Sequence, residues 1–125
     1  MTARLALTLS ALLMAAAIAL GAFGAHALRS RVSPELQAVW QTAVAYHAWH
    51  ALGLLAAGLY LLHRPDAALM SWSTWLFVGG IVLFSGSLYA LVLTGTRALG
   101  AITPLGGAAF IAGWLAFAWA VWRNA

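Results

Sequence analysis

The chain contains no cysteine and no lysine, and only two of its 125 residues are acidic, Glu35 and Asp66. The lack of cysteine excludes disulfides, thiolate metal sites and cysteine nucleophiles. The lack of lysine excludes Schiff-base chemistry and the lysine of a phosphate-binding loop. Only 6% of the residues are charged, whereas a soluble domain carries about a quarter. Because so few charges cannot cover a surface that faces water, the sequence indicates a protein whose solvent is lipid.

The few charged residues flank long hydrophobic runs. The six basic residues are all arginines: Arg4, Arg29, Arg31, Arg64, Arg97 and Arg123. This distribution is typical of interfacial anchors, so nucleic acid is not an expected partner despite the formal net charge of +4. The arginines divide equally between the two predicted sides of the membrane and give no orientation. Glu35 and Asp66 fall on opposite sides, ~30 Å apart, which excludes a carboxylate pair within one subunit.

Four apolar segments occupy nearly the whole chain, in which 65% of the residues are hydrophobic. They cover residues 5–28, 34–62, 71–93 and 103–122. Each is long enough for a membrane-spanning helix, which needs about 20 apolar residues. Their continuous apolar character differs from the alternation expected of barrel strands. The sequence therefore predicts one all-α domain over residues 1–125, an integral membrane four-helix bundle with both termini on the same side.

The ends of these segments carry local signals. Ser33-Pro34-Glu35 reads as a helix start, with a hydroxyl cap, a proline in the first turn and an acid at the positive end of the dipole. Thr103-Pro104 gives a second start of this kind. The first segment imitates a secretory signal ending at residues 25–27. Its apolar run is longer than the ~7–15 residues found in such a signal, so we expect a retained helix, with cleavage as the alternative.

Helices in lipid associate through small residues that allow their backbones to approach closely. The glycines at helical spacing are therefore predicted packing positions: Gly21, Gly24, Gly53, Gly79, Gly86, Gly106 and Gly113. On the second helix, Thr42, Tyr46, His50, Gly53 and Ala57 share an arc of about 100°, which we expect to face inward. Leucine at Gly86 or Gly113 is predicted to disrupt the bundle, and leucine at Ala48 is not.

Histidines are the sharpest candidates for chemistry. His47 and His50 lie three residues apart on the second helix, and His26 ends the first. Ionisable groups inside a membrane are costly and suggest haem or metal ligation, a proton relay or a substrate pocket. The alternative is a set of neutral imidazoles that hydrogen-bond neighbouring helices, each contributing about 0.6–2 kcal/mol. We favour this alternative, with no metal and no cofactor, because a carboxylate, a cysteine and a second histidine pair are missing.

Four runs of sequence carry a family resemblance: GAFGAH at residues 21–26, WQTAV at 40–44, FSGSLY at 84–89, and TPLGG at 103–107 with GW at 113–114. The chain resembles the bacterial domain of unknown function 423 family, which is related to eukaryotic transmembrane protein 256. The resemblance implies a four-helix protein of the bacterial plasma membrane and implies no activity. It carries over these candidate ligand or polar-core positions: His26, Tyr46, His50, Ser85, Ser87, Tyr89 and Thr103. His47 lies outside the pattern, which favours His26 and His50 over a His47/His50 metal pair.

Three functions follow as hypotheses. The first is a non-enzymatic accessory, assembly or small oligomeric component of the plasma membrane, with the lipid bilayer and either further copies or a membrane protein complex as partners. It predicts that a partner buries one of the glycine stripes. The second is transport or permeation of a small solute, proton or lipid, which needs His26, Tyr46 and His50 around a wet cavity. The third is a haem or metal protein with histidine ligands. No catalytic residue is assigned, because a nucleophile such as Ser87 has no base and acid that can be named.

Overall fold

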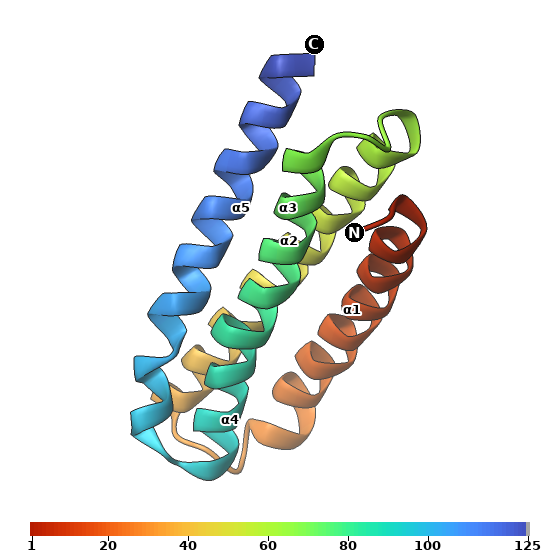
Figure 1. Cartoon of the computed structure of the whole chain (residues 1–125). Coiled ribbons are helices and arrows are strands. Elements are labelled where there is room, and N and C mark those ends of the chain that lie inside the picture. Colours follow the sequence, from red (N-terminus) through yellow and green to blue (C-terminus); the bar gives the residue numbers. More distant parts are fainter. Residues whose placement is uncertain (125) are drawn as a thin grey trace.

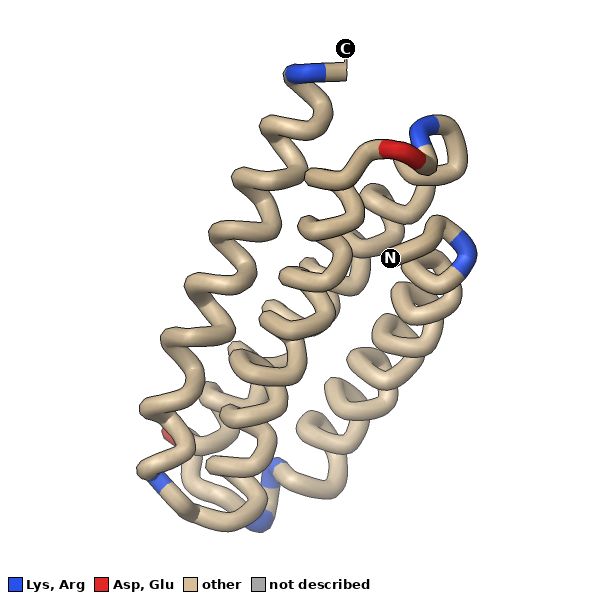
Figure 2. The backbone as a smooth tube through the Cα atoms, viewed as in Figure 1, with Lys and Arg blue, Asp and Glu red and all other residues tan. Residues whose placement is uncertain are grey.

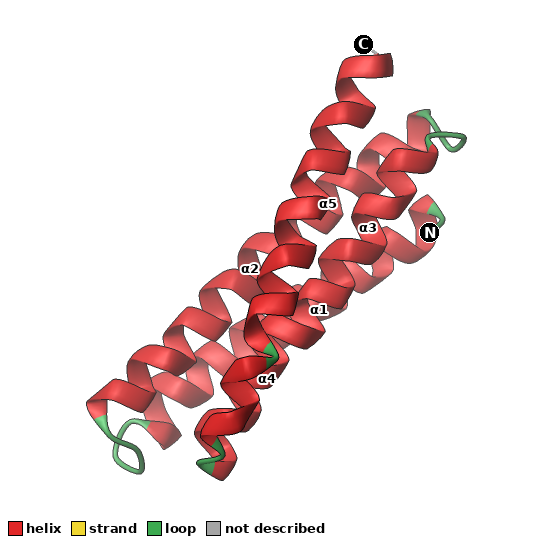
Figure 3. Cartoon of the chain, turned by 60° about the vertical axis from the view of Figure 1, so that its left-hand side comes forward, coloured by secondary structure: helices red, strands yellow, loops and turns green. Residues whose placement is uncertain are grey.

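The structure is a computed structural model that describes residues 1–124. These residues form helices joined by short turns, with no strand among them (Figure 3), as the all-α prediction requires. Four long helical segments follow one another. The first is α1 (Ala3–Phe23), which continues into the π-helix η1 (Gly24–Leu28), and the second is α2 (Pro34–His63). The third is α3 (Ala68–Gly80), which continues through the π-helix η2 (Ile81–Ser85) into α4 (Gly86–Thr94), and the fourth is α5 (Thr103–Asn124), which follows the 3-10 helix η3 (Arg97–Ala101).

Local sequence explains where several segments begin and end. The Ser33 hydroxyl accepts a hydrogen bond from the Leu36 amide at 3.2 Å, and Pro34 occupies the first turn of α2. α4 ends at Gly95, whose φ of 71° lies in the left-handed region that favours glycine. The sequence predicted that the third segment begins at residue 71, but it begins three residues earlier, at Ala68. The two π-helical stretches were not predicted, because nothing in the local sequence distinguishes them from α-helix.

The four segments lie side by side and alternate in direction (Figure 1). α2 packs against α1 on one side and against α3 and α4 on the other, while α5 packs against α3 and η2. α1 and α5 therefore form the outer edges of the molecule, and the first and last described residues lie at the same end (Figure 1). The charged residues gather at the two ends of the helices (Figure 2).

The outer surface is apolar along the helices. Large apolar side chains are more than 60% exposed at Leu12, Ile18, Ile111 and Leu115. A soluble protein exposes few contiguous apolar side chains of this kind to water. Three segments are long and apolar enough to cross a membrane: Ala3–Leu28, Ala68–Thr94 and Arg97–Asn124. α2 is not one of them, because it carries two buried histidines and other polar side chains. The least apolar helix therefore lies between neighbours that bury its two central histidines, His47 and His50, whereas Thr42 stays exposed.

α3 and η2 pack tightly against α5 because glycines of α5 face aromatic rings. A Cβ added to Gly113 would lie 2.8 Å from Cε1 of Phe77. One added to Gly106 would lie 2.7 Å from the Cα of Phe84, so here the glycine meets backbone rather than a flexible side chain. Gly80 on α3, which was not among the predicted packing positions, lies in the same way against a ring of α5. These contacts are the close approach that helices in lipid use to associate.

α1 packs against α2 through small residues. Ala6 and Ala17 are buried in this contact, and the buried Ser10 hydroxyl donates a hydrogen bond to the carbonyl of Ala51 at 2.9 Å. A Cβ added to Gly58 would lie 2.9 Å from the side chain of Leu7. The α1–α2 contact thus combines close backbone approach with a buried side-chain-to-backbone hydrogen bond.

Three predicted inward positions differ from expectation. A Cβ added to Gly79 would meet nothing within 4 Å, and one added to Gly86 would meet only the Ile81 carbonyl, at 3.8 Å. Both glycines therefore face open space rather than another helix, and the structure gives no packing reason for leucine at Gly86 to disrupt the molecule. Thr42 is exposed, and its hydroxyl bonds the Ala38 carbonyl of its own helix at 3.1 Å.

Candidate functional site

The most buried polar side chain of α2 is His47, which is only 3% exposed. Its Nδ1 lies 2.9 Å from the hydroxyl of Tyr89 on α4, and one of these two groups donates the hydrogen bond. Its Nε2 is buried and has no hydrogen-bond partner. The Trp40 ring packs on the other side of Tyr89, with ring centroids 4.7 Å apart. Trp40, His47 and Tyr89 thus form a polar and aromatic cluster between α2 and α4.

His50 occupies a separate cluster, one helical turn along α2. Its ring stacks on Phe110 of α5, with centroids 3.4 Å apart and planes within 9°. Its Nδ1 lies 2.7 Å from the carbonyl of Tyr46 and donates to it. Gly53 leaves room for Trp114, whose ring a Cβ at that position would approach to 3.0 Å. His50 therefore joins α2 to α5 through ring contact, and one ring nitrogen is occupied by its own helix.

The hydroxyl candidates are occupied by helix contacts. Ser85 is fully buried, and its hydroxyl donates to the carbonyl of Ala43 on α2 at 2.7 Å. The Ser87 hydroxyl lies 2.7 Å from that of Thr103, which joins α4 to the start of α5. It also donates to the Phe84 carbonyl at 2.9 Å. Each of these serines lies where two segments meet, which is the arrangement expected of hydrogen bonds between helices in lipid.

His26 does not join these groups. It is exposed on η1, whereas His50 is buried near the middle of α2. The structure therefore does not bring His26 and His50 together as the resemblance suggested. In residues 1–124 no three histidine or acidic side chains lie close enough to hold a metal ion. Glu35 and Asp66 are exposed at opposite ends of the molecule (Figure 2).

A groove at the surface lies between the end of α1 and the start of α2. It has a volume of about 190 Å³ and is mostly apolar. Its lining residues come from α1, η1 and α2: Gly21, Gly24, Ala25, Gln37, Trp40, Gln41, Val44 and Ala45. Two side chains of α2 fix its wall: Trp40 Nε1 donates to the Leu20 carbonyl at 2.9 Å, and Gln37 Nε2 donates to the Gly24 carbonyl at 2.7 Å. These bonds join α2 to backbone carbonyls at the junction of α1 and η1.

Sequence reasoning undervalued three residues of this region. His47 was set aside because it lies outside the family pattern, yet it makes the hydrogen bond to Tyr89. Trp40 and Gln37 were not candidates, yet they bond the end of α1. A signal was present, because Gln37, Trp40 and Val44 follow the three- and four-residue spacing of one helix face.

Comparison with known proteins places the chain in a family. The family described as protein of unknown function (DUF423) matches residues 20–107. A UPF0382 membrane protein of Staphylococcus haemolyticus is 46% identical over 112 residues, which cover 90% of each chain. The UPF0382 membrane protein YwdK of Bacillus subtilis is 48% identical over 99 residues, which cover 79% of this chain and 80% of the relative. No solved structure matches. The resemblance inferred from the sequence is thus confirmed, and the chain belongs to the DUF423 family, whose relatives named here are membrane proteins.

Proposed function

We propose that this protein is a multi-pass component of the bacterial plasma membrane, with both termini on one side, and that it acts by binding another membrane component rather than by catalysing a reaction. Three segments of 26 to 28 residues support the membrane crossings, because ~20 residues suffice to span the hydrocarbon. We take α2 as the fourth crossing, in which His47 and His50 are buried against neighbouring helices. An even number of crossings returns the chain to the side where it began.

The interior supports a binding rather than a catalytic role. Ser85, Ser87 and His47 form hydrogen bonds between helices, His50 stacks on Phe110, and none of these four residues lines the groove between α1 and α2. A transport path of the kind considered above would place His26, Tyr46 and His50 around a wet cavity. Instead, His26 is exposed, and Tyr46 and His50 both pack against Phe110.

One observation carries the proposal: two helical glycines lie open on the outside of the α3–α4 segment. Gly21, Gly24, Gly53, Gly58, Gly80, Gly106 and Gly113 are all met by a neighbouring helix, whereas Gly79 and Gly86 are not. Glycine weakens a helix by about 1 kcal/mol relative to alanine, so an open glycine has a cost without an internal benefit. In lipid, such positions allow a second helix to approach closely. The partner would be another copy or a helix of another membrane protein.

The test is purification from native membranes in mild detergent, followed by size analysis and mass spectrometry of co-purifying proteins. We expect Gly79→Leu and Gly86→Leu to release the partner or dissociate the oligomer while the helical circular dichroism stays unchanged. Ala15→Leu, at an exposed small residue of α1, is the matched control and should retain the complex. A wild-type protein that is monomeric and partner-free would contradict the proposal, as would leucine variants that keep every partner.

The proposed topology has its own test, because the chain lacks cysteine and a single cysteine can be introduced without background. Thr2→Cys and Asn124→Cys lie at one end of the helices, and Ser30→Cys and Thr96→Cys lie at the other. In intact cells, a membrane-impermeant maleimide should label one of these pairs and leave the other unlabelled. Labelling of Thr2→Cys and Ser30→Cys to the same extent would refute the crossing of α1.

A further inference from the structure

The groove between the end of α1 and the start of α2 is left open by helix packing. We propose that it binds one anionic phospholipid, with an acyl chain along its glycine and alanine floor and the phosphate beside Arg31. The inference rests on the membrane location of the chain and not on the open glycines of α3–α4, which lie on a different segment. Failure of one proposal therefore leaves the other to be judged by its own experiment.

The groove becomes more polar along its length. Gly21 and Val44 lie farther from the α1–α2 connection than Gln37, because the two helices run in opposite directions from it. The apolar part thus points toward the middle of the helices, and the glutamine amides lie toward the end that carries Arg29 and Arg31 (Figure 2). A phospholipid has the same order, with its acyl chains deep and its polar head at the interface. A helix of a partner protein would instead need an apolar surface along its full length.

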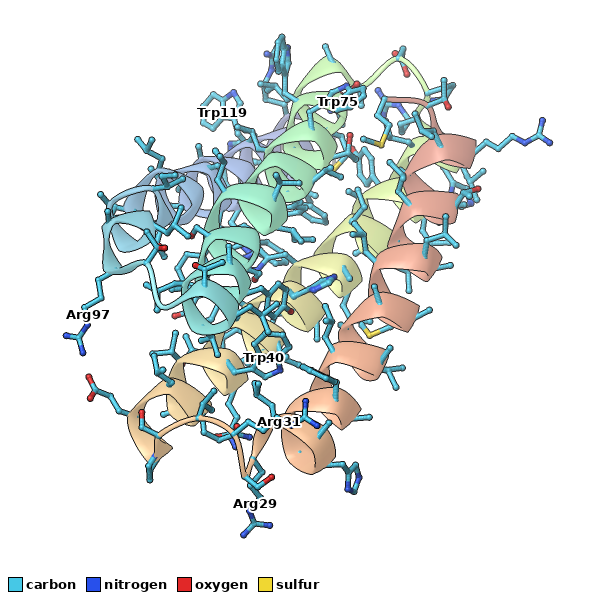
Figure 4. The ribbon with its side chains drawn as sticks, turned by 90° about the horizontal axis from the view of Figure 1, so that it is seen from below. Arg29, Arg31, Trp40, Trp75, Arg97 and Trp119 are labelled. Carbon is cyan, nitrogen blue, oxygen red and sulfur yellow. The ribbon has the colours of Figure 1, made fainter. Side chains whose placement is uncertain are left out.

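The charges at this end suit a phosphate. Arg29 and Arg31 are exposed, and neither forms an ion pair with a carboxylate in the described chain, whereas Arg64 at the other end lies 3.7 Å from Asp66. In the view from below, the Arg31 side chain is seen between the ribbons of α1 and α2, while Arg29 points away from the bundle (Figure 4). Guanidinium groups bind phosphate oxygens through two parallel hydrogen bonds. The connection therefore offers a cation without a carboxylate partner at the same end of the helices as the polar part of the groove.

The groove is formed before a ligand arrives. Small residues on α1 and η1 make its floor, and the Trp40 ring occupies the space that a side chain at Gly24 would fill. The hydrogen bonds from Trp40 to Leu20 and from Gln37 to Gly24 hold the wall in place. A preorganised site binds more tightly, because less side-chain freedom is lost on binding.

The experiment is native mass spectrometry of the full chain in mild detergent, titrated separately with phosphatidylglycerol and phosphatidylcholine that carry the same acyl chains. We expect one phosphatidylglycerol per chain, bound about fivefold more tightly than phosphatidylcholine, because an arginine near an anionic headgroup contributes on the order of a fivefold gain. Arg29→Gln with Arg31→Gln should remove that preference. Arg4→Gln with Arg123→Gln changes the net charge equally at the other end and should leave it intact.

A second pair of variants tests the groove itself. Ala25 lines the groove and is exposed, so Ala25→Phe should fill it and abolish binding of both lipids. Ala22→Phe changes a nearby exposed residue of α1 outside the groove and should bind as the unchanged protein does. The inference is overturned if the two lipids bind equally, if the two arginine pairs behave alike, or if Ala25→Phe retains binding. A dimer that disappears with Ala25→Phe would assign the groove to a second copy of the chain and would also overturn it.

Discussion

The substitution Gly106→Ala tests the packing of α5 most directly. The added methyl group would lie 2.6 Å from the Cβ and 2.7 Å from the Cα of Phe84. Both atoms are closer than van der Waals contact allows, and one of them is backbone, so no rotation of a side chain relieves the clash. α5 must therefore move away from η2, which also disturbs the hydrogen bond between Ser87 and Thr103 at the same end of the helices.

The magnitude follows from two opposing effects. Alanine favours a helix over glycine by up to about 1 kcal/mol. Overpacking a close contact costs about 1–3 kcal/mol, and a clash with backbone belongs at the upper end of that range. Gly106→Ala should therefore lower the free energy of unfolding by roughly 1–2 kcal/mol. Gly79→Ala is the matched control because it meets nothing within 4 Å, and it should leave stability unchanged or raise it by up to about 1 kcal/mol.

The assay is reversible unfolding in mixed micelles with increasing sodium dodecyl sulfate, followed by circular dichroism. The two alanine variants share the same chemical change, so the detergent and the intrinsic helix preference affect both. Their difference isolates the helix contact. Equal unfolding free energies for the two variants, or a Gly106→Ala protein more stable than the unchanged chain, would refute the close approach of α5 to η2.

Three further predictions use the same unfolding assay. Tyr89→Phe removes the hydrogen bond to His47 and should lower the free energy of unfolding by about 1 kcal/mol. Tyr60→Phe removes only the 3.4 Å contact with the Ala120 carbonyl and should lower it less. The reverse order would contradict the cluster between α2 and α4. Ser87→Ala and Thr103→Val should show a coupling of about 0.6–2 kcal/mol in a double-mutant cycle, and strictly additive effects would show that their contact adds no stability. His26→Ala should change stability by less than about 0.5 kcal/mol because the side chain is exposed, and a larger loss would place His26 in a contact absent from this structure.

The sequence was most informative where the deciding interactions are local or compositional. Ser33-Pro34-Glu35 predicts a helix start because the cap and the proline act within one turn, and the structure begins α2 there. The apolar runs predict helices because a chain in lipid must satisfy its backbone groups within each segment. Gly106 and Gly113 lie seven residues apart on an uninterrupted α-helix, so both face the α3–η2 segment, Gly106 against Phe84 and Gly113 against Phe77. No information beyond helix geometry was needed for these features.

Three of the misplaced residues, Gly79, Gly86 and His26, lie in or close to the π-helical stretches, whereas Thr42 lies within the α-helix α2. Assigning faces at about 100° per residue assumes regular α-helix, and a π turn contains more residues than an α turn. η2 separates Gly79 from Gly86, so their spacing of seven residues does not place them on one inward stripe. η1 contains His26, which lies on the exposed side rather than in the interior. Sequence periodicity does not locate such turns, because their residues have the same apolar character as the α-helix on either side.

The same physical constraint explains why the polar residues of this chain are poor guides to its activity. In hydrocarbon no water is available, so a buried hydroxyl or imidazole is stabilised by a partner on a neighbouring helix. Ser10 and Ser85 have such partners and His47 has one for Nδ1, which makes these bonds structural whether or not the protein also binds a ligand, whereas the buried Ser73 hydroxyl has none among the described residues. Function is therefore to be sought on the surfaces that helix packing leaves open. Two such surfaces are the open glycines of the α3–α4 segment and the groove beside Trp40.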